Sequence, residues 1–515
     1  MARLRVLSEL DTARTQYYHF KAIIIAGMGL FTDAYDLFSI TLIIKMMGRI
    51  YYDHRKGDDR FQTPPVVTSA LVAAALLGTA VGQLVFGRLG DLKGRLRVYG
   101  FALLLMVFSS LASAFSICIR KTCVFVTLGF FRFMLGLGIG GDYPLSSTIM
   151  SEFANKRTRG SFIAAVFSMQ GFGILASSTV TVVVCSIFRA ASKSSEADVA
   201  WRLILMLGSV PAAMTYYWRM MMPETARYTA LVEHNVMQAA KDMEKVLDVR
   251  LSMIAEDSPL PPIPHPYPLF SREFFRRHGR DLFASSSTWF LVDIVFYSQV
   301  LFQSEIYKRY LDQNENENGN VDVYKEAIHV AWIQAVITVC STIPGYFFSV
   351  YFIDRWGRVK IQMMGFFFMA LIFFIIGIPY YTFWTTEENE ENKWFMVLYG
   401  LAFFFANFGP NTTTFIVPAE LFPARFRSTC HGISGAAGKV GAMIGSVGFL
   451  WASHHKKEYG YSKGIGMQVT LIILGGVCLL GMLITYFFTT ETMGRSLEEN
   501  EVGDVTDEVE ERDNL

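Results

Sequence analysis

Long apolar segments recur along the whole chain, separated by polar segments of varied length. A helix needs about 20 mostly apolar residues to cross a bilayer, and it satisfies its own backbone polar groups while doing so. About twelve segments meet this requirement. They lie at residues 20–46, 66–88, 98–119, 122–150, 161–188, 201–222, 282–303, 328–352, 361–382, 393–418, 431–453 and 467–489. We therefore expect an all-α membrane protein with twelve transmembrane helices.

A polar stretch at 223–281 separates the first six segments from the last six. Its part SPLPPIPHPYP favours an extended chain, and its amphipathic piece at 231–249 suits either a membrane surface or solvent. We expect a six-helix bundle at 1–222, a linker at 223–281, a second six-helix bundle at 282–490 and an acidic tail at 491–515. The end of the tail, GDVTDEVEERDNL, favours disorder.

The charges are distributed unequally between the connecting loops. Basic residues follow the even-numbered segments, for example Lys93, Arg95 and Arg97 after the second, whereas the loops at 311–326 and 386–394 are acidic. Because basic loops stay in the cytoplasm, we expect both chain ends and the linker there. The expected location is the plasma membrane, with the chain crossing it many times.

Composition agrees with a membrane location. The chain is 52% hydrophobic and 18% charged, with a mean hydropathy of +0.33, values that exclude an ordinary soluble domain. The formal net charge of +1 gives no reason to expect a nucleic-acid partner. The cysteines are Cys118, Cys123, Cys185, Cys340, Cys430 and Cys478. Their spacing suggests buried packing roles, without a metal site or a disulfide framework.

The two groups of six segments repeat each other's motifs at an offset of about 265 residues. The matched pairs are GDLKGR at 90–95 with IDRWGR at 353–358, Glu152 and Arg159 with Glu420 and Arg427, and PET at 223–225 with TET at 490–492. Such spacing indicates a duplicated six-helix unit and two pseudo-symmetric halves. Parallel repeats of this kind are typical of the major facilitator fold.

Several motifs carry a resemblance to known proteins. GRLGDLKGR, PETARY, DRWGR and PAELFPARFR resemble the major facilitator superfamily near its sugar-porter branch. FTDAYDLF, GGDYPLSSTIMSE, AAVFSMQGFGIL, STWFLVDIVFYSQ and GPNTTTFIVPAE are similar to segments of the plant and fungal proton-phosphate symporters. The similarity runs from about residue 10 to residue 497. It implies a secondary active transporter that imports inorganic phosphate with protons by alternating access.

Charged side chains inside apolar segments are costly in a bilayer and therefore indicate function. They are Asp33, Asp36, Arg132, Asp142, Asp293 and Lys439. Asp33 and Asp36 share one face of the first helix, and helical rise places Asp33 at a depth between Asp142 and Arg132. We expect Asp33, Asp142 and Arg132 to meet across one cavity and to couple protons to transport, as the resemblance also implies for the two aspartates. A permanent ion pair between the two helices is the alternative.

The seventh segment carries Trp289, Asp293 and Tyr297 on one helical face. The resemblance assigns phosphate contacts to Tyr143, Gln170, Trp289, Asp293, Tyr297 and Asn411. Asp293 can accept a hydrogen bond from dihydrogen phosphate, whereas fully deprotonated sulfate has no hydroxyl to donate. Lys439 either attracts an anion into the cavity or extends its amine to the cytoplasmic edge.

Ion-pair latches are expected in the matched cytoplasmic loops. The proposed gating residues are Asp91, Arg95, Glu152, Arg159, Asp354, Arg358, Glu420 and Arg427. Aspartate and arginine of each loop would pair with helix-end partners such as Glu152 and Glu420. These latches would hold the outward-open state and break during the transport cycle.

Two other functions are compatible with the sequence. A sugar or organic-anion porter is one, although the QQxxG signature of sugar porters is replaced by a single Gln299 in the seventh segment. A phosphate sensor with little transport is the other. Lys21 and the pair Ser177 and Ser178 depart from the symporters, which more often have an uncharged residue and glycines there. The expected partners are phosphate, protons and lipid, with no cofactor, metal or enzymatic activity.

Overall fold

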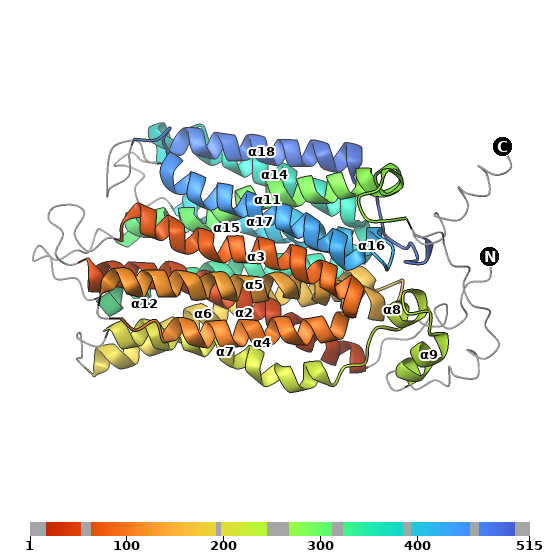
Figure 1. Cartoon of the computed structure of the whole chain (residues 1–515). Coiled ribbons are helices and arrows are strands. Elements are labelled where there is room, and N and C mark those ends of the chain that lie inside the picture. Colours follow the sequence, from red (N-terminus) through yellow and green to blue (C-terminus); the bar gives the residue numbers. More distant parts are fainter. Residues whose placement is uncertain are drawn as a thin grey trace, which may run out of the picture.

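The computed structural model describes most of the 515-residue chain. The described residues are 17–52, 63–118, 120–191, 197–244, 267–311, 323–384, 393–453 and 463–499. Every regular element within these ranges is a helix. The long helices run side by side through the molecule, and the two short helices α8 and α9 lie at one end, which we call the linker end (Figure 1).

The first set of membrane helices forms the N-terminal half. It comprises α2 (Tyr17–Tyr51), α3 (Pro65–Lys93), α4 (Arg95–Ala114), α5 (Lys121–Phe153), α6 (Arg159–Ala190) and α7 (Ala197–Met220). The helices α8 (Ala226–Leu231) and α9 (Val236–Glu244) follow in the linker. The amphipathic piece at 231–249 is described only as far as α9, and the proline-rich part before residue 267 and the tail after residue 499 lie outside the described residues.

The second set forms the C-terminal half, in which two spans are interrupted. It comprises α11 (Arg272–Leu311), α12 (Val323–Ile337), η4 (Thr338–Thr342), α13 (Ile343–Trp356), α14 (Arg358–Gly377), η5 (Tyr380–Trp384), α15 (Lys393–Asn407), α16 (Pro410–Leu421), α17 (Arg427–Ala452) and α18 (Met467–Phe488). A π-helical turn joins α12 to α13 in one continuous span. The second interruption lies between α15 and α16, where the helix stops and Gly409 precedes the proline that starts α16.

The expected twelve-helix architecture is confirmed. Among the described residues, ten helices are long and apolar enough to cross a membrane. The other two spans are α11, which begins in the polar sequence REFFRRHGRD, and the broken pair α15 and α16. The apolar segments of the sequence therefore correspond to spans even where a break or a polar start lowers the mean hydropathy.

The repeated motifs shape matching turns in the two halves. Gly94, between α3 and α4, and Gly357, between α13 and α14, have φ values of 95° and 92°, which glycine adopts without strain. A carboxylate lies against each turn: Glu224 accepts from the backbone of Leu96 at 3.1 Å, and Glu491 accepts from the backbone that follows Gly357 at 3.1 and 3.0 Å. The same motif, repeated in each half, thus forms the same turn structure twice.

Glycines allow close contact between helices. An added Cβ at Gly136 would lie 2.2 Å from the carbonyl oxygen of Ala75, and one at Gly140 would lie 2.3 Å from that of Thr79, both on α3. The GLGIGG sequence therefore packs α5 against α3. Across the two halves, a Cβ at Gly432 on α17 would lie 2.2 Å from a carbonyl oxygen of α3. Side chains could not be added at these contacts without moving the helices apart.

The prediction for the cysteines is wrong at three positions. Cys118 and Cys123 form a disulfide between α4 and α5, with Cα atoms 5.8 Å apart. Cys118 lies in the connection between the two helices and Cys123 in the first turn of α5, and their short spacing gave no sign of pairing. Cys340, in the π-helical turn, is exposed, whereas Cys185, Cys430 and Cys478 are buried as expected.

Candidate functional site

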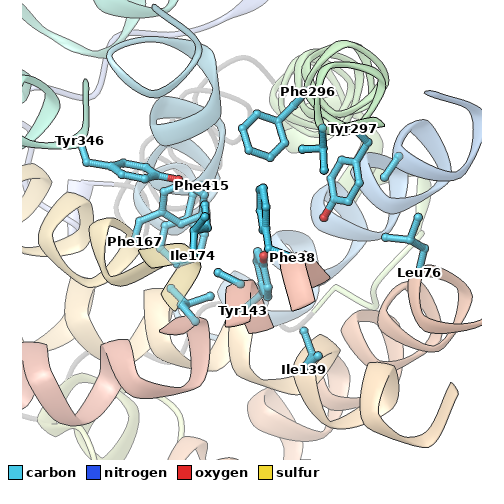
Figure 2. Close-up of a cluster of buried hydrophobic side chains, with 14 of the residues drawn as sticks. Phe38, Leu76, Ile139, Tyr143, Phe167, Ile174, Phe296, Tyr297, Tyr346 and Phe415 are labelled. Atoms are coloured by element: carbon cyan, nitrogen blue, oxygen red, sulfur yellow. The ribbon is translucent and has the colours of Figure 1, made fainter. Parts of the chain in front are cut away.

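A polar cavity lies between the two halves, near the middle of the bundle. Its lining residues come from α2, α5 and α6 of the N-terminal half and from α11, α16 and α17 of the C-terminal half. The space not filled by atoms is about 380 Å³. Aromatic side chains surround it, among them Tyr143, Phe167 and Tyr297 (Figure 2). A site built from both halves changes its shape whenever the halves move relative to each other.

The structure brings the six expected phosphate-contacting residues to this one cavity. They are Tyr143, Gln170, Trp289, Asp293, Tyr297 and Asn411. All six are buried, and they come from four different helices. Asp33 and Lys439 line the same cavity. The cavity therefore offers several hydrogen-bond donors, one cation and two carboxylates in a small volume.

Hydrogen bonds connect the N-terminal residues of the cavity to the C-terminal ones. The Tyr143 hydroxyl donates to Asp33 Oδ2 at 2.5 Å, and Gln170 Nε2 donates to the Tyr143 hydroxyl at 2.7 Å. The Tyr346 hydroxyl donates to Gln170 Oε1 at 3.2 Å, and Asn411 Nδ2 donates to the Tyr346 hydroxyl at 3.3 Å. Sequence reasoning missed Tyr346, because one tyrosine in an apolar segment is usually a packing residue.

Lys439 points into the cavity. Its Nζ donates to the Tyr297 hydroxyl at 2.8 Å and lies 3.4 Å from Asp293 Oδ2. It also lies 5.0 Å from the centre of the Tyr143 ring. The side chain is 3% exposed, so the interpretation in which it extends to the membrane edge is wrong. Gly438, beside it, leaves room for the Trp289 indole, because a Cβ there would lie 2.5 Å from the indole Cδ1.

Aromatic rings separate the cavity from the linker end. The Phe415 ring stacks on Phe167 at 4.6 Å and meets the Trp289 ring edge-on at 6.3 Å. His431 lies against both Trp289 and Phe415, 5.3 Å from each ring, and its Nε2 lies 3.0 Å from the Phe415 carbonyl oxygen. We call Phe167, Trp289, Phe415 and His431 the aromatic floor. A hydrated anion cannot pass this layer while the rings are in contact.

Asp142 does not meet Arg132 at the cavity, contrary to the sequence-based prediction. Its Oδ1 pairs with Arg219 Nη1 at 2.8 Å, and both side chains are buried. Arg219 also donates to the Ile25 carbonyl oxygen at 3.1 Å. The carboxylate fills space left by Gly29 on α2, where a Cβ would lie 2.1 Å from it. Arg219 was missed because it stands at the end of an apolar segment, where a basic residue usually reaches the membrane surface.

Arg132 lies close to the aspartates of α2 instead. It interacts electrostatically with Asp36 and Asp33, and all three are buried. Neither carboxylate oxygen of Asp36 has a hydrogen-bond partner within the described residues. A buried carboxylate without hydrogen bonds is costly in its charged form, and Arg132 is the nearby countercharge.

At the linker end, Glu152 joins the two halves. It pairs with Arg95 of its own half at 3.3 Å and with Arg427 of the other half at 2.8 Å, and it accepts from the Thr225 hydroxyl at 2.5 Å. Asp91 accepts from two backbone N–H groups at the start of α17, at 3.2 and 2.7 Å. The carboxylate thus caps a helix of the opposite half.

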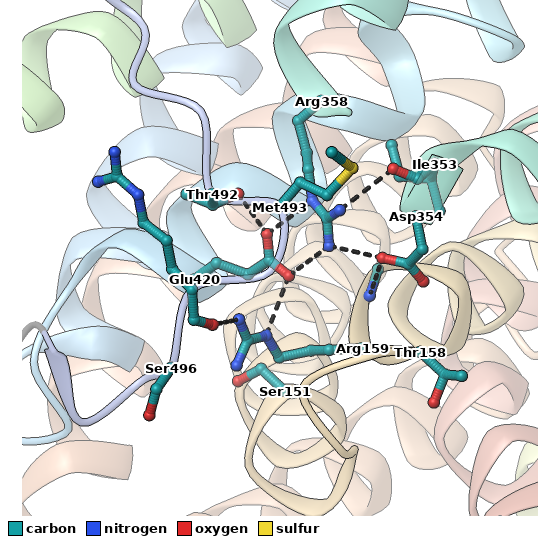
Figure 3. A network of polar contacts seen from close by, with 12 residues as sticks. Ser151, Thr158, Arg159, Ile353, Asp354, Arg358, Glu420, Thr492, Met493 and Ser496 are labelled. Carbon is teal, nitrogen blue, oxygen red and sulfur yellow. Dashed lines mark hydrogen bonds and ion pairs between the residues drawn. The ribbon is translucent and has the colours of Figure 1, made fainter. Parts of the chain in front are cut away.

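Glu420 repeats this arrangement in the C-terminal half. It pairs with Arg358 at 2.8 Å and with Arg159 of the other half at 3.0 Å, and it accepts from Thr492 at 2.5 Å (Figure 3). Asp354 accepts from two backbone N–H groups at the start of α6, at 3.2 and 2.7 Å. We call the Glu152 and Glu420 groups together the linker-end network. Each glutamate takes one arginine from each half, and the two groups are related by the repeat.

Contacts also join the halves at the opposite end. Arg49 on α2 pairs with Glu326 on α12 at 2.7 Å. Gln334 on α12 donates to Ser178 at 2.9 Å and to Ser177 at 3.3 Å, both on α6. The cavity therefore lies between joined ends. The structure corresponds to a state closed at the linker end, with the opposite end also held by polar contacts.

Two bundles of membrane helices that enclose a polar cavity, with charged networks across their interface, define a transporter of the major facilitator type. The family described as sugar (and other) transporter matches residues 22–503, and the chain belongs to this family. The fold is similar to that of the proton:xylose symporter XylE bound to 6-bromo-6-deoxy-D-glucose, with a TM-score of 0.70 and 20% identity over 94% of this chain and 98% of that one.

Curated relatives match over nearly their whole length. A probable inorganic phosphate transporter 1-9 of Arabidopsis thaliana is 61% identical, over 97% of this chain and 96% of the relative. The low affinity inorganic phosphate transporter 1 of Petunia hybrida is 53% identical, over 96% of this chain and 95% of the relative. The family resemblance inferred from the sequence motifs is thereby confirmed.

Proposed function

We propose that this protein imports inorganic phosphate together with protons across the plasma membrane by alternating access. One observation carries the proposal: residues from both halves with complementary polar groups for an anion line one cavity. The names of the relatives that are 61% and 53% identical support phosphate as the substrate. No enzymatic step is part of the proposal.

The cavity chemistry suits dihydrogen phosphate. Tyr143, Gln170, Asn411 and Lys439 can donate to its oxygens. Asp293 can accept a hydrogen bond from one of its hydroxyl groups, whereas sulfate would meet that carboxylate without a donor. Selectivity thus follows from one acceptor placed among donors. A neutral sugar would leave Lys439 without an anionic partner other than Asp293, so the cavity suits an anion better than a sugar.

A proton route follows α2. Asp36 lies nearest the end opposite the linker, Asp33 lies in the cavity, and Asp142 packs against Gly29, one helical turn nearer the linker end. Arg132 serves the first two carboxylates as countercharge, and Arg219 serves the third. We propose that protons enter through Asp36 and Asp33 and leave through Asp142.

Charge sets the number of protons. Moving one negative charge into a cell costs about 2.3 kcal/mol per 100 mV of membrane potential. One proton would only neutralise dihydrogen phosphate, so at least two protons per cycle are needed for the potential to drive uptake. The linker end faces the cytoplasm in this proposal, and the linker-end network opens to release phosphate.

The test is uptake of labelled phosphate by purified protein in lipid vesicles with an inward proton gradient. Uptake should stop when a protonophore removes the gradient, and Asp33→Asn should lower proton-driven uptake by about 100-fold. Asp242→Asn, on α9 outside the bundle, is the matched control and should transport normally. Binding of phosphate without uptake would identify a sensor, and uptake of xylose in place of phosphate would identify a sugar porter.

A further inference from the structure

The hydrogen bonds around the cavity form one directed chain. It begins at Asn411, whose amide donates both to Asn407 Oδ1 at 2.8 Å and to Tyr346, and it continues through Gln170 and Tyr143 to Asp33. Every hydrogen between Asn411 and Asp33 points toward Asp33. The chain crosses from the C-terminal half to the N-terminal half between Tyr346 and Gln170.

The hydrogen bond at the end of this chain is strongest when its acceptor, the Asp33 carboxylate, is ionised. A tyrosine hydroxyl has one hydrogen, and in both Tyr143 and Tyr346 that hydrogen is committed to the next member. Gln170 uses one amide hydrogen for Tyr143 and its carbonyl oxygen for Tyr346. With Asp33 ionised, this hydrogen-bond chain therefore keeps the Tyr143 hydroxyl hydrogen and one Gln170 amide hydrogen from an anion in the cavity.

Protonation of Asp33 can reverse the direction of the hydrogen bond between Tyr143 and Asp33. The protonated carboxyl can donate to the Tyr143 oxygen, which releases the Tyr143 hydrogen and then the Gln170 amide hydrogen toward the cavity. Because the nitrogen and the oxygen of the Gln170 amide turn together, Tyr346 then loses its acceptor, and the change reaches Asn411 on the other half. The donor hydrogens of this hydrogen-bond chain thus become available to phosphate once a proton has been taken up, in addition to those of Lys439.

We propose that this chain couples proton binding at Asp33 to phosphate binding, and that Tyr346 is the positioning residue that carries the coupling between the halves. Tyr346 is 1% exposed and is not among the residues that line the cavity. Its ring meets Phe167 edge-on at 5.8 Å, and this contact fixes the hydroxyl between Gln170 and Asn411. It acts through those two amides and does not touch the substrate.

Other ionisable groups act on Asp33 and set the pH range of the effect. They are Asp36 on its own helix, Arg132, Asp142 and Tyr143 on α5, Asp293 and Tyr297 on α11, Tyr346 on α13 and Lys439 on α17. None of them supplies a second hydrogen-bonded path from Asp33 to Asn411 among the described residues. Removal of one hydroxyl therefore interrupts the chain.

The inference rests on the proposed function, and its test measures the pH dependence of KM in lipid vesicles. KM is expressed as the concentration of dihydrogen phosphate, so that ionisation of the substrate does not contribute. In the wild-type protein KM should rise with external pH, by about tenfold per unit at most, because the competent protonated fraction shrinks. In Tyr346→Phe the rise should fall below about threefold per unit, with KM at the lowest pH nearly unchanged.

Tyr399→Phe is the matched control. It removes a buried hydroxyl that donates to the Gln299 carbonyl oxygen at 2.7 Å and that is not part of the hydrogen-bond chain from Asn411 to Asp33. The wild-type pH dependence should therefore remain. If Tyr346→Phe does not fold, Gln170→Met interrupts the chain on the other side of Tyr346 and should flatten the same pH dependence.

The outcomes separate the two proposals. A Tyr346→Phe protein whose KM is shifted by the same factor at every pH would overturn the coupling chain and leave Tyr346 a packing residue. Absence of phosphate uptake by the wild-type protein would instead overturn the proposed function.

Discussion

At the scale of single residues, the chemistry of the cavity depends on how its charged side chains are paired. Lys439 is shared between Asp293 and the Tyr297 hydroxyl, so an entering anion meets a cation that is already partly satisfied. Asp142 is paired with Arg219, whereas Asp36 has no hydrogen-bond partner among the described residues. The carboxylates therefore differ in role even though the sequence presents them as one type.

Replacing Asp293 by Asn should test anion selectivity. The amide can still form a hydrogen bond with phosphate. Because it is neutral, it no longer repels sulfate and no longer balances the charge of Lys439. We expect KM for phosphate to rise about tenfold, and sulfate to become an effective competitor. The measurement is phosphate uptake with increasing sulfate. Sulfate competition equal to that of the wild-type protein would contradict this account of selectivity.

At the scale of helices, side-chain hydrogen bonds join α6 and α12 across the two halves. The hydroxyl groups of Ser177 and Ser178 on α6 accept from the Gln334 amide on α12. A hydrogen bond of this kind contributes about 1 kcal/mol. It favours closure of the end opposite the linker, which faces the outside in the proposed orientation, and so lowers the fraction of molecules that are open at that end.

The double replacement Ser177→Gly and Ser178→Gly should therefore lower KM for external phosphate by about threefold, since the outward-open fraction rises. Ser113→Gly in α4 is the control for glycine in a membrane helix, because the Ser113 hydroxyl bonds only within its own helix, at 2.8 Å to Ser109. Uptake at a series of phosphate concentrations measures the effect. An unchanged or higher KM in the double variant would show that these bonds do not limit opening.

The helices themselves were predictable from sequence, while many of their contacts were not. Apolar length fixes a span, and the motifs with Gly94 and Gly357 fix matching turns, because both depend on neighbouring residues. Partners such as Arg219 for Asp142 depend on the rotation and depth of two distant helices. A shift of one residue turns a side chain by about 100° around the helix, so spacing alone could not select Arg219 over Arg132.

At the scale of the whole molecule, the chain after α18 joins the two halves. Arg159 donates to the Arg495 carbonyl oxygen, Glu498 pairs with Arg227 at 2.8 Å, and Lys156 lies 3.5 Å from Glu499. This C-terminal strap lies beside the linker-end network. It should stabilise the state that is closed at the linker end.

Burial raises the pKa of Glu498, but the charge of Arg227 and hydrogen bonds from Ser496 and Arg227 outweigh it and lower the pKa to about 2. A carboxylate whose pKa is lowered by folding stabilises the folded state at every pH above its pKa in the unfolded chain. This stabilisation is lost only as the pH falls toward about 2. The strap is thus intact throughout the physiological range. The pH dependence of transport must arise elsewhere.

Glu498→Gln should weaken the strap and increase opening at the linker end. A cysteine placed at Ser151, beside the network, should react with a thiol reagent about three- to tenfold faster in the Glu498→Gln background. The increase should be the same at pH 5.5 and 7.5, because Glu498 is ionised at both values. A rate that changed only at the lower pH would contradict the assignment.

The disulfide between Cys118 and Cys123 distinguishes the two ends of the molecule by the redox conditions that suit them. It lies in the α4–α5 connection, away from α8 and α9. Disulfides persist in oxidising surroundings and are rare where glutathione keeps thiols reduced. The end with the disulfide therefore suits the cell exterior and the linker end suits the cytosol, in agreement with the orientation inferred from basic loops. Two unrelated chemistries, redox and electrostatic, would place the protein in the membrane in the same direction.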